Sequence, residues 1–421
     1  MANAFNKEVR IMFDEMVEGF DDLLIAGKLA RKFRPASDQD MQRMGDQMWL
    51  NVPNIAASYD GFDQTANFGD ITEMAVPISI GFHKSANGKM SAKDLRDPLQ
   101  LANYGKAAKQ KLASDINLAL FNTVALQGSQ FIKRTTAPTG FDDVAAADAQ
   151  LTEQGVPLAD RKMLLSPRSY NAMASNLAKP QTSGLPQTMT AFEKAYLGNV
   201  AGFETYKNDQ TFRLGAATGG ATTVNGANQY WVPKATSTAA TGETANVDNR
   251  YSPLAVTAAT YANIKPGDAF TIAGVNAVHM ITKQDTGQLQ TFRVIGKPAA
   301  GVILIAPALI SGGGATKAEL EYKNVTATPA NGAAITWLNT TTADLNPFFL
   351  QDSLILIPGS FTVNPEDGWR VMRATTDLGI AITYVERGDI NDLSVKYRWD
   401  IDFGTALLNP QMAGVEAFNQ V

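Results

Sequence analysis

The sequence predicts an α+β protein that carries an inserted all-β domain. Three observations support this class. Apolar residues recur at steps of three and four from Pro98 to Gly128, which predicts one helix of about 30 residues. Near the end of the chain, apolar and polar residues alternate from Leu393 to Phe403, as in a long half-buried strand. Between these elements, residues 221–344 are rich in Ala, Thr and Gly and show regularly spaced turn signals, which is typical of small barrels and sandwiches.

The composition is that of a folded chain without covalent cross-links. Of the 421 residues, 45% are hydrophobic and 18% are charged, which is typical of globular proteins. The formal net charge of −5 disfavours tight, sequence-reading DNA binding. The absence of cysteine excludes disulfides and thiolate metal sites. No apolar leader segment and no run of about 18 apolar residues is present, so we expect a soluble, intracellular protein.

The first region, residues 1–48, is expected to form an N-terminal arm. Apolar residues recur at helical steps between Asn6 and Phe33, which predicts one amphipathic helix, and Pro35 ends the pattern. The members of this stripe are Val9, Phe13, Met16, Phe20 and Leu24. The stripe either folds back on its own core or lies on a neighbouring subunit, and the sequence leaves both possibilities open.

Residues 49–83 are expected to form an extended two-stranded ribbon. A short strand is ended by Pro53, and alternating apolar residues from Val76 onward predict the returning strand. The tip between them is rich in Gly, Asn and Asp, and its aromatic residues, Tyr59, Phe62 and Phe68, are expected subunit contacts. A two-stranded ribbon is only marginally stable in water. We therefore expect it to lie against something else, which in an assembly is the next subunit.

The long helix has its own start and stop signals. Asp97 is a suitable N-cap, and Pro98 fits the first helical position, where no N–H is needed. Gly128 is suited to the left-handed position that ends many helices. Gly105 lies inside the helix and costs about 1 kcal/mol relative to Ala, which indicates close packing or bending at that point.

Around this helix we expect two mixed regions. A peripheral region comprises residues 84–135 and 386–421, and an axial region comprises residues 136–220 and 345–385. The expected strands are 163–165, 353–357 and 380–385, and the expected helices are 144–151, 168–177 and 191–197. Strands that alternate with helices indicate a mixed domain.

The region 221–344 is expected to fold independently, because surface loops tolerate inserted domains. Its expected strands are 254–258, 269–272, 291–295, 302–305 and 334–338. It begins with a low-complexity loop, Lys234–Val247, that no core pattern explains.

No pattern in the sequence indicates catalysis. The two histidines, His83 and His279, are far apart in the chain, and neither has a metal-ligand partner at suitable spacing. The glycines around Gly88-Lys89 do not have phosphate-loop spacing. Acidic pairs such as Asp142-Asp143 are more typical of turns than of active sites. We therefore expect no catalytic residue, no cofactor and no metal.

With these elements in order, several stretches resemble a known family. They are Ser91–Asp97, Tyr230–Pro233, Asn246–Arg250, Ile264–Asp268 and Phe270–Val275. Together with the arm, ribbon, long helix and inserted β domain, they resemble the major capsid (coat) proteins of short-tailed double-stranded-DNA bacteriophages. The fold class expected from this resemblance is the tailed-phage capsid fold with an inserted β barrel.

The resemblance implies a structural function. Its members build icosahedral shells of pentamers and hexamers, first as a procapsid with a scaffolding protein and a portal, and then around packaged double-stranded DNA that is contacted non-specifically. The implied location is the virion, after assembly in the host bacterial cytoplasm, with no membrane partner.

The resemblance also implies contact residues. A loop of the inserted domain reaches between capsomers in such relatives, and here it would include Lys234, Glu243, Asp248 and Arg250. Only three charges lie between Lys234 and Asp248, which departs from a strongly acidic loop. Scaffolding contacts would fall in the N-terminal region, at Lys7 and Arg10.

Two other functions remain open from the sequence. The inserted domain could bind glycan or protein through its aromatic residues, which are Tyr230, Trp231, Tyr251 and Trp337. Alternatively, the pair Asp142-Asp143 could serve an unusual hydrolase.

Overall fold

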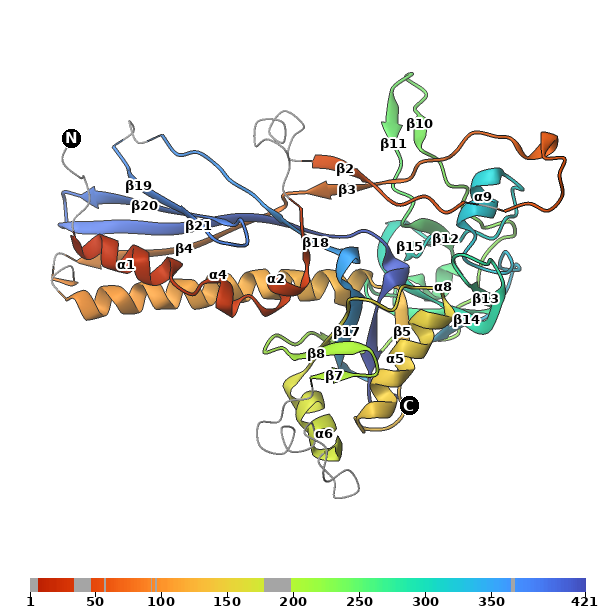
Figure 1. Ribbon diagram of the computed structural model, residues 1–421, viewed down its shortest axis with the longest axis horizontal. Helices are drawn as coiled ribbons and strands as arrows, with labels where there is room; N and C mark the ends of the chain where they lie inside the picture. Colours follow the sequence, from red (N-terminus) through yellow and green to blue (C-terminus); the bar gives the residue numbers. More distant parts are fainter. Residues whose placement is uncertain are drawn as a thin grey trace. The chain divides into compact units, whose positions relative to one another are not determined.

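The computed structural model describes residues 7–33, 47–56, 58–91, 93–94, 97–177, 198–364 and 368–421. The helix expected at 191–197 lies outside these residues. The chain divides into two compact units (Figure 1). The first comprises Met1–Met48, Ile78–Phe121 and Leu354–Ala406, and the second comprises Trp49–Pro77, Asn122–Ser353 and Leu407–Val421. The division into five regions that the sequence suggests stays a prediction.

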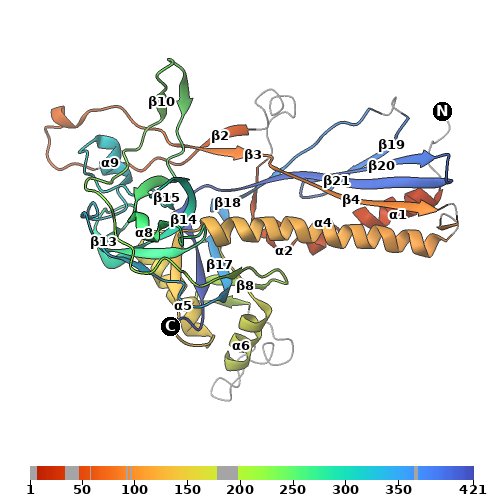
Figure 2. The ribbon, with the colours of Figure 1, turned by 180° about the vertical axis from the view of Figure 1, so that it is seen from behind.

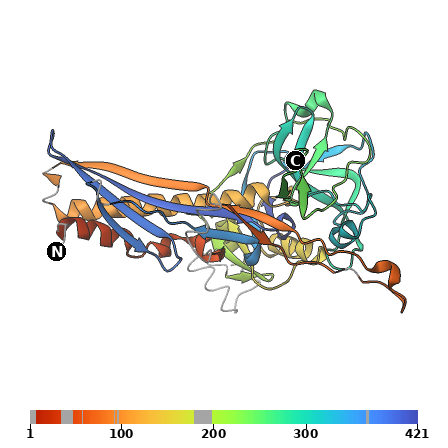
Figure 3. The same cartoon turned by 90° about the horizontal axis from the view of Figure 1, so that it is seen from above.

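The first unit is built on a six-stranded sheet. Its strands are β1 (Arg31–Lys32), β4 (Phe82–Ser91), β18 (Leu354–Pro358), β19 (Arg370–Thr375), β20 (Ala381–Asp389) and β21 (Ser394–Leu407). The long strand expected at Leu393–Phe403 is confirmed as β21, which pairs antiparallel with both β20 and β4. Figure 3 shows β4 in orange beside the blue strands of this sheet.

The expected long helix is confirmed as α4 (Pro98–Gln127). Asp97 caps it, because its Oδ1 accepts a hydrogen bond from Leu99 N at 3.0 Å. The prediction that Gly128 ends the helix in the left-handed conformation is wrong, because its φ is not in that region. A Cβ there would lie 2.8 Å from Val124 O and 3.0 Å from the backbone of Ala413. Close backbone packing, rather than a positive φ, explains this glycine.

The N-terminal arm is not one helix, so the prediction of a single helix up to Phe33 is wrong. Helix α1 (Lys7–Val17) ends before Gly19, whose φ is +64°. The 3-10 helix η1 (Asp21–Leu23) and helix α2 (Ile25–Leu29) follow. The helical pattern continues across Gly19 in the sequence, but this left-handed residue redirects the backbone.

The apolar stripe of the arm folds back on its own unit. Met12, Met16, Phe20 and Leu24 are fully buried. Phe13 stacks on Trp399 of β21, with ring centroids 5.7 Å apart. Figures 1 and 2 show α1 lying along α4 beside the sheet. The sequence leaves open whether the stripe folds back on its own core or lies on a neighbouring subunit, and in this chain it folds back on its own core.

Gly105 explains how α1 and α4 approach each other. A Cβ at Gly105 would lie 2.5 Å from the carbonyl oxygen of Met12, closer than real Cβ atoms come to backbone. Close packing, one of the two reasons expected for this glycine, is thereby confirmed. Farther along α4, Asn117 accepts a hydrogen bond from Ala26 N at 3.1 Å and donates one to Leu23 O at 2.8 Å. These contacts tie the arm to the helix.

The second unit contains a seven-stranded sheet. Its strands are β5 (Gln130–Lys133), β6 (Arg161–Leu165), β7 (Asn199–Val200), β8 (Phe203–Lys207), β9 (Arg213–Leu214), β17 (Ala343–Leu350) and β22 (Ala413–Ala417). Helices α5 (Phe141–Glu153) and α6 (Pro167–Leu177) contribute to its hydrophobic core through residues such as Leu151 and Met173. The strand expected at 163–165 and the helices expected at 144–151 and 168–177 are confirmed. The 3-10 helices η5 (Gln351–Ser353) and η7 (Pro410–Met412) adjoin this sheet.

The five strands expected between 254 and 338 are confirmed in a second sheet of this unit. They are β12 (Ser252–Ala255), β13 (Ala269–Val278), β14 (Asp285–Ala299), β15 (Val302–Ala306) and β16 (Ile335–Trp337). Residues 222–225 connect its two edges, because Thr257 N donates to Thr223 O and Val224 N donates to Ala333 O. The sheet encloses a core that includes Phe270, Phe292 and Trp337. Two short helices, α8 (Ala258–Tyr261) and α9 (Lys317–Tyr322), accompany it.

Two smaller pairs of strands complete the description. Strands β2 (Gln47–Asn51) and β3 (Ala75–Ser79) form the base of the expected ribbon, and the short 3-10 helix η2 (Thr65–Asn67) lies at its tip. The alternating run that the sequence assigns to one returning strand belongs to two, since β3 ends at Ser79 and β4 begins at Phe82. Strands β10 (Thr236–Thr238) and β11 (Thr244–Asn246) form a hairpin where a loop is expected.

Candidate functional site

The base of the ribbon is held within the second unit by α9. Tyr322 Oη lies 3.1 Å from Asn54 Oδ1 and 3.0 Å from Thr72 O, so its single proton can be donated to either oxygen. Lys317 Nζ donates to Gly69 O at 2.8 Å. Burial raises the pKa of the Tyr322 hydroxyl, so it is neutral and available as a donor at neutral pH. In Figure 1 the ribbon runs beside α9 and extends past it.

The tip of the ribbon has internal order but little cover. Asp63 Oδ1 accepts hydrogen bonds from Thr65 N at 3.0 Å and from Thr65 Oγ1 at 2.6 Å, and these bonds lower the pKa of its carboxyl. Gln64 donates to Gly61 O at 2.6 Å. The predicted contact residues Phe62 and Phe68 are nevertheless 109% and 86% exposed. An ordered turn therefore presents two phenyl rings to solvent, which is unusual unless a partner covers them.

The exposed fraction of the other apolar residues of the ribbon also increases from its base to its tip. Ile71 is 66% exposed, and Tyr59 is 39% exposed. Ile55 and Met74, nearer the base, pack on a buried cluster that includes Ile310 and Tyr322. The ribbon is thus anchored at one end and uncovered at the other.

The hairpin β10–β11 carries the other predicted contact residues. All six residues of its two strands are exposed, as are Lys234 at its start and Glu243 near its turn. Figures 1 and 2 show the hairpin projecting from the second unit. Asn249 closes its base by donating to Lys234 O at 2.8 Å and accepting from Lys234 N at 3.1 Å.

Asp248 and Arg250 already form an ion pair within the chain. Arg250 Nη2 donates to Asp248 Oδ2 at 2.7 Å, and Arg250 Nη1 donates to Leu407 O at 2.8 Å. The guanidinium also lies 4.9 Å from the ring centroid of Tyr251. Because both charges are satisfied here, this pair stabilises the base of the hairpin. The sequence does not reveal this pairing, since a spacing of two residues has no preferred geometry in a loop.

The predicted scaffolding residues lie at the start of α1. Lys7 is its first residue, and the Arg10 side chain is exposed on the helix. Their role in binding a partner stays a prediction.

The aromatic residues proposed for glycan binding do not form an exposed platform. Trp337 is only 9% exposed and packs edge-on against Phe270. Trp231 donates its Nε1–H to Asn249 Oδ1 at 3.1 Å. Tyr230 packs against the hydrophobic core of the sheet formed by β12–β16. These side chains stabilise the fold locally.

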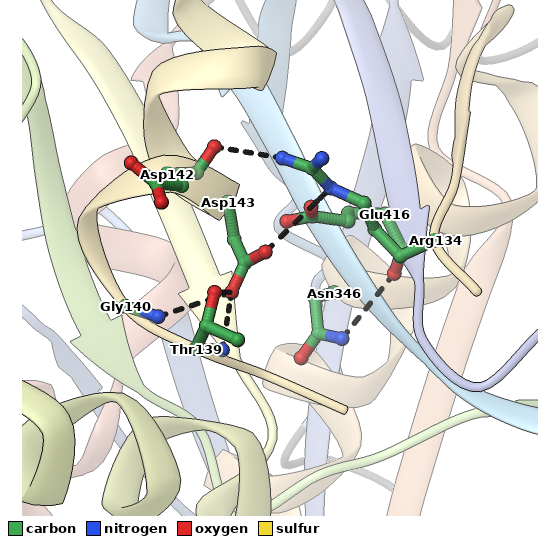
Figure 4. Close-up of polar contacts among 7 residues, drawn as sticks. All are labelled: Arg134, Thr139, Gly140, Asp142, Asp143, Asn346 and Glu416. Atoms are coloured by element: carbon green, nitrogen blue, oxygen red, sulfur yellow. Dashed lines mark hydrogen bonds and ion pairs between the residues drawn. The ribbon is translucent and has the colours of Figure 1, made fainter. Parts of the chain in front are cut away.

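The acidic pair Asp142-Asp143 is divided between two structural roles (Figure 4). Asp143 Oδ2 accepts from Gly140 N at 3.1 Å and from Thr139 Oγ1 at 3.1 Å, at the start of α5. Asp142 accepts a hydrogen bond from Arg134 Nη2 through its backbone carbonyl, at 2.7 Å. The two carboxylates therefore do not converge as an acid and base would.

Arg134 links this turn to a buried glutamate. Its Nε lies 3.0 Å from Glu416 Oε1 and 3.6 Å from Asp143 Oδ1, and the Glu416 side chain is fully buried. Burial raises the pKa of Glu416 to about 8, and the Asp143 charge adds to the shift while Arg134 opposes it. Within the described part of the chain, Glu416 Oε2 has no hydrogen-bond partner. The charge of Glu416 therefore depends on pH near neutrality.

Each histidine is satisfied by its own surroundings. His279 Nδ1 accepts hydrogen bonds from Ile281 N at 3.2 Å and Thr282 N at 3.1 Å. His83 Nδ1 lies 2.5 Å from Asp402 Oδ1 on β21. In the described residues, no group of three or more His, Asp or Glu side chains is arranged to hold a metal ion. None of the helices described is long and apolar enough to cross a membrane.

One family model and several solved structures are similar to this chain. The family model described as "P22 coat protein - gene protein 5" matches residues 1–419. A solved chain of Mycobacterium phage Che8 is similar at 11% identity, with 93% of this chain and 90% of that chain covered and a TM-score of 0.46. The capsid structure of the cyanophage P-SCSP1u is similar at 12% identity, with 93% and 87% covered and a TM-score of 0.45. The CUS-3 coat protein I-domain is 39% identical over 28% of this chain and 96% of its own length, with a TM-score of 0.22.

Proposed function

The chain belongs to the P22 coat protein family, and from this premise we propose that its copies self-assemble into the pentamers and hexamers of an icosahedral shell. Its general role as a structural coat protein of the phage virion, and not an enzyme, follows from the family itself. The finer proposal concerns how the coat is built: first as a procapsid in the host cytoplasm, with a scaffolding protein and a portal, and then as a capsid around the genome.

The observation that carries this proposal is the uncovered tip of the ribbon. Phe62 and Phe68 are almost entirely exposed, although the turn that bears them is ordered by its own hydrogen bonds. Fully burying a phenylalanine contributes roughly 1.5–3 kcal/mol, so two such residues supply a substantial part of a subunit contact. Such a tip is costly in an isolated subunit and useful in a shell.

Two further contacts are part of the proposal. The exposed hairpin β10–β11, with Lys234 and Glu243, meets a neighbouring capsomer, while the Asp248–Arg250 pair keeps the hairpin base in place. Lys7 and Arg10 on α1 contact the scaffolding protein. The net charge of −5 supports weak, non-specific contact with packaged DNA rather than wrapping of it.

Negative-stain microscopy tests the proposal most simply. The purified full-length chain, alone and with its scaffolding protein, is expected to give rings of five and six copies or closed shells. A chain that stays monomeric in both conditions at every concentration tested would contradict the proposal.

The second candidate, a glycan- or protein-binding module in the region 221–344, is supported by no specific observation. Its aromatic residues are used in local packing and hydrogen bonding, as described above.

A further inference from the structure

A buried cluster beside β5 and β22 contains two carboxylates and one cation (Figure 4). Glu416 comes from β22, Asp143 comes from the start of α5, and Arg134 follows β5. The side chains of Glu416 and Asp143 are 0% and 3% exposed, and that of Arg134 is 26% exposed. One guanidinium therefore serves two acids that are both removed from water. If both acids were ionised, the cluster would carry an unbalanced negative charge, which burial makes costly.

Glu416 is held in the middle of a sheet. Its strand pairs with β17 on one side and with β5 on the other, where the register partners of Glu416 are Asn346 and Ile132. The side chain of Asn346 also donates to Glu416 O at 3.2 Å. The carboxyl group therefore cannot move to solvent, and water reaches it only when a neighbouring segment moves away. Within the described residues, its Oε2 atom has no hydrogen-bond partner that would compensate a charge.

The loop 134–140, which connects β5 to α5, is the neighbouring segment with most freedom. Asp143 closes it on one side, because its Oδ2 accepts hydrogen bonds from Thr139 N at 2.5 Å and from Gly140 N at 3.1 Å. Arg134 closes it on the other side, because its Nη2 donates to a backbone carbonyl in the first turn of α5 at 2.7 Å. The loop can therefore open while β5 and the rest of α5 stay in place.

The proton on Glu416 decides whether the cluster is balanced. With Glu416 neutral, Arg134 and Asp143 form a pair without net charge. With Glu416 ionised, a second negative charge competes for the same guanidinium and repels Asp143. Burial raises the pKa of Glu416 to about 8, and the negative charge of Asp143 adds to this rise while Arg134 opposes it. Opening the loop lets water reach the carboxyl group and returns its pKa toward 4.5, so opening releases a proton.

We propose that this cluster is a proton-dependent latch: with a proton on Glu416 the loop 134–140 is held closed, and loss of that proton releases the loop and the start of α5. All of these groups belong to one copy of the chain and to its second unit, so the latch does not depend on the proposed self-assembly. It gives the second unit a response to pH in a range where carboxyl groups of ordinary pKa stay ionised.

Hydrogen exchange measured by mass spectrometry on the full-length chain tests the latch. Protection in a peptide covering residues 135–143 is followed from about pH 6 to about pH 9 and corrected for the intrinsic exchange rate at each pH. Because opening releases one proton, protection is expected to fall about tenfold for each pH unit up to about pH 8 and then to level off.

Glu416→Gln is the main variant, because its amide stays neutral at every pH. Protection in the loop is expected to become independent of pH and to stay at the level that the wild type shows at low pH. Asp142→Asn is the matched control, since it removes the exposed acid next to Asp143, and it is expected to keep the pH dependence of the wild type. A pH dependence that Glu416→Gln retains would overturn the latch.

A second helix start in the same unit distinguishes local opening from global unfolding. The start of α9 is closed by Glu319, whose carboxylate accepts from Gly314 N at 3.0 Å and from Thr316 N at 3.1 Å. If the loop opens locally, protection in a peptide covering residues 314–319 is expected to change by less than about twofold for each pH unit. Equal slopes in the two peptides would indicate global unfolding and overturn the latch.

Asp143→Asn provides an independent check if Glu416→Gln does not fold. This substitution leaves Arg134 to Glu416 alone, which lowers the pKa of Glu416. The pH at which loop protection levels off is therefore expected to move down by about one unit. If Asp143 only closes the loop, the substitution would lower protection equally at every pH. Levelling off at the same pH as in the wild type would overturn the proposal.

Discussion

The arm and the ribbon both carry apolar residues away from the main sheets, but the structure treats them in opposite ways. On the arm, Met12 and Phe20 are fully buried against the arm's own unit. On the ribbon, Phe62 and Phe68 are exposed to solvent. An apolar stripe in a terminal segment is therefore not evidence of a subunit contact. The covered stripe stabilises the subunit, and the uncovered tip is available for association.

The distinction is energetic as well as geometric. Truncating a buried side chain costs its transfer free energy and leaves a cavity, so the loss appears in the free energy of unfolding of the chain. Truncating an exposed side chain hardly changes the free energy of unfolding. It weakens association only where a partner covers that side chain. Substitutions in the two regions should thus separate folding from assembly.

The largest effect is expected in the arm. Phe20→Ala should lower the free energy of unfolding by about 3–5 kcal/mol, because it removes a fully buried ring. Urea denaturation followed by circular dichroism measures this change. A loss below about 1 kcal/mol would show that the arm is only loosely attached and would remove the contrast with the ribbon.

The free energy of unfolding measured against pH should also distinguish a buried carboxyl, Glu416, from an exposed carboxyl of the ribbon. Burial raises the pKa of Glu416 to about 8 from 4.5, so between these values the folded state binds more protons than the unfolded state. The contribution of Glu416 to the free energy of unfolding should therefore fall as pH rises from about 4.5 to 8, by an amount on the order of 5 kcal/mol, and then level off. Urea denaturation at several pH values measures the slope.

Two substitutions check the assignment of this pH dependence. Glu416→Gln should flatten the profile, because it removes the titrating group. Asp63→Asn in the exposed ribbon should leave the profile unchanged, since its lowered pKa lies below this window. A wild-type profile that rises over the same range would contradict the raised pKa of Glu416.

Gly105→Ala tests the contact between the arm and α4. Alanine favours a helix by about 1 kcal/mol, but its Cβ would lie 2.5 Å from Met12 O, so backbone has to shift. The net expectation is a loss of about 1–3 kcal/mol in the free energy of unfolding. Gln110→Ala, on an exposed position of the same helix, should stay within about 0.5 kcal/mol of wild type. A stabilised Gly105→Ala variant would show that arm and helix are not packed closely.

A smaller effect is expected at the anchored end of the ribbon. Tyr322→Phe removes the hydroxyl that donates to Asn54 or Thr72, which should cost about 1 kcal/mol. Hydrogen exchange should then become faster in residues 52–74 and remain unchanged in α4. Uniform acceleration along the chain would indicate global destabilisation instead of release of the ribbon.

The sequence predicts those parts of the fold that have local causes. The helix α4 follows from its period, its uninterrupted length and the Asp97 cap, and the strands of the second barrel-like sheet follow from alternation bounded by turns. The break at Gly19 is missed, because a glycine within a helical period can either continue or end the helix. The role of Gly128 is misjudged, because the close approach of Ala413 comes from a distant part of the chain.

The candidate contact surfaces were predictable only in part. The exposed aromatic residues of the ribbon follow from its length and polarity, which leave no local core for them. The anchoring of the ribbon by Tyr322 and Lys317 and the Asp248–Arg250 pair depend on which segments meet in three dimensions. Residue type and spacing carry no signal for these contacts.

The most direct test of the central claim is sedimentation velocity of the full-length chain and its Phe62→Ala/Phe68→Ala variant over a range of concentrations. We expect the wild type to sediment as capsomers or shells and the variant as a folded monomer, with a free energy of unfolding within about 1 kcal/mol of the wild-type value. A variant that assembles as readily as wild type would contradict the claim that the uncovered ribbon tip drives association.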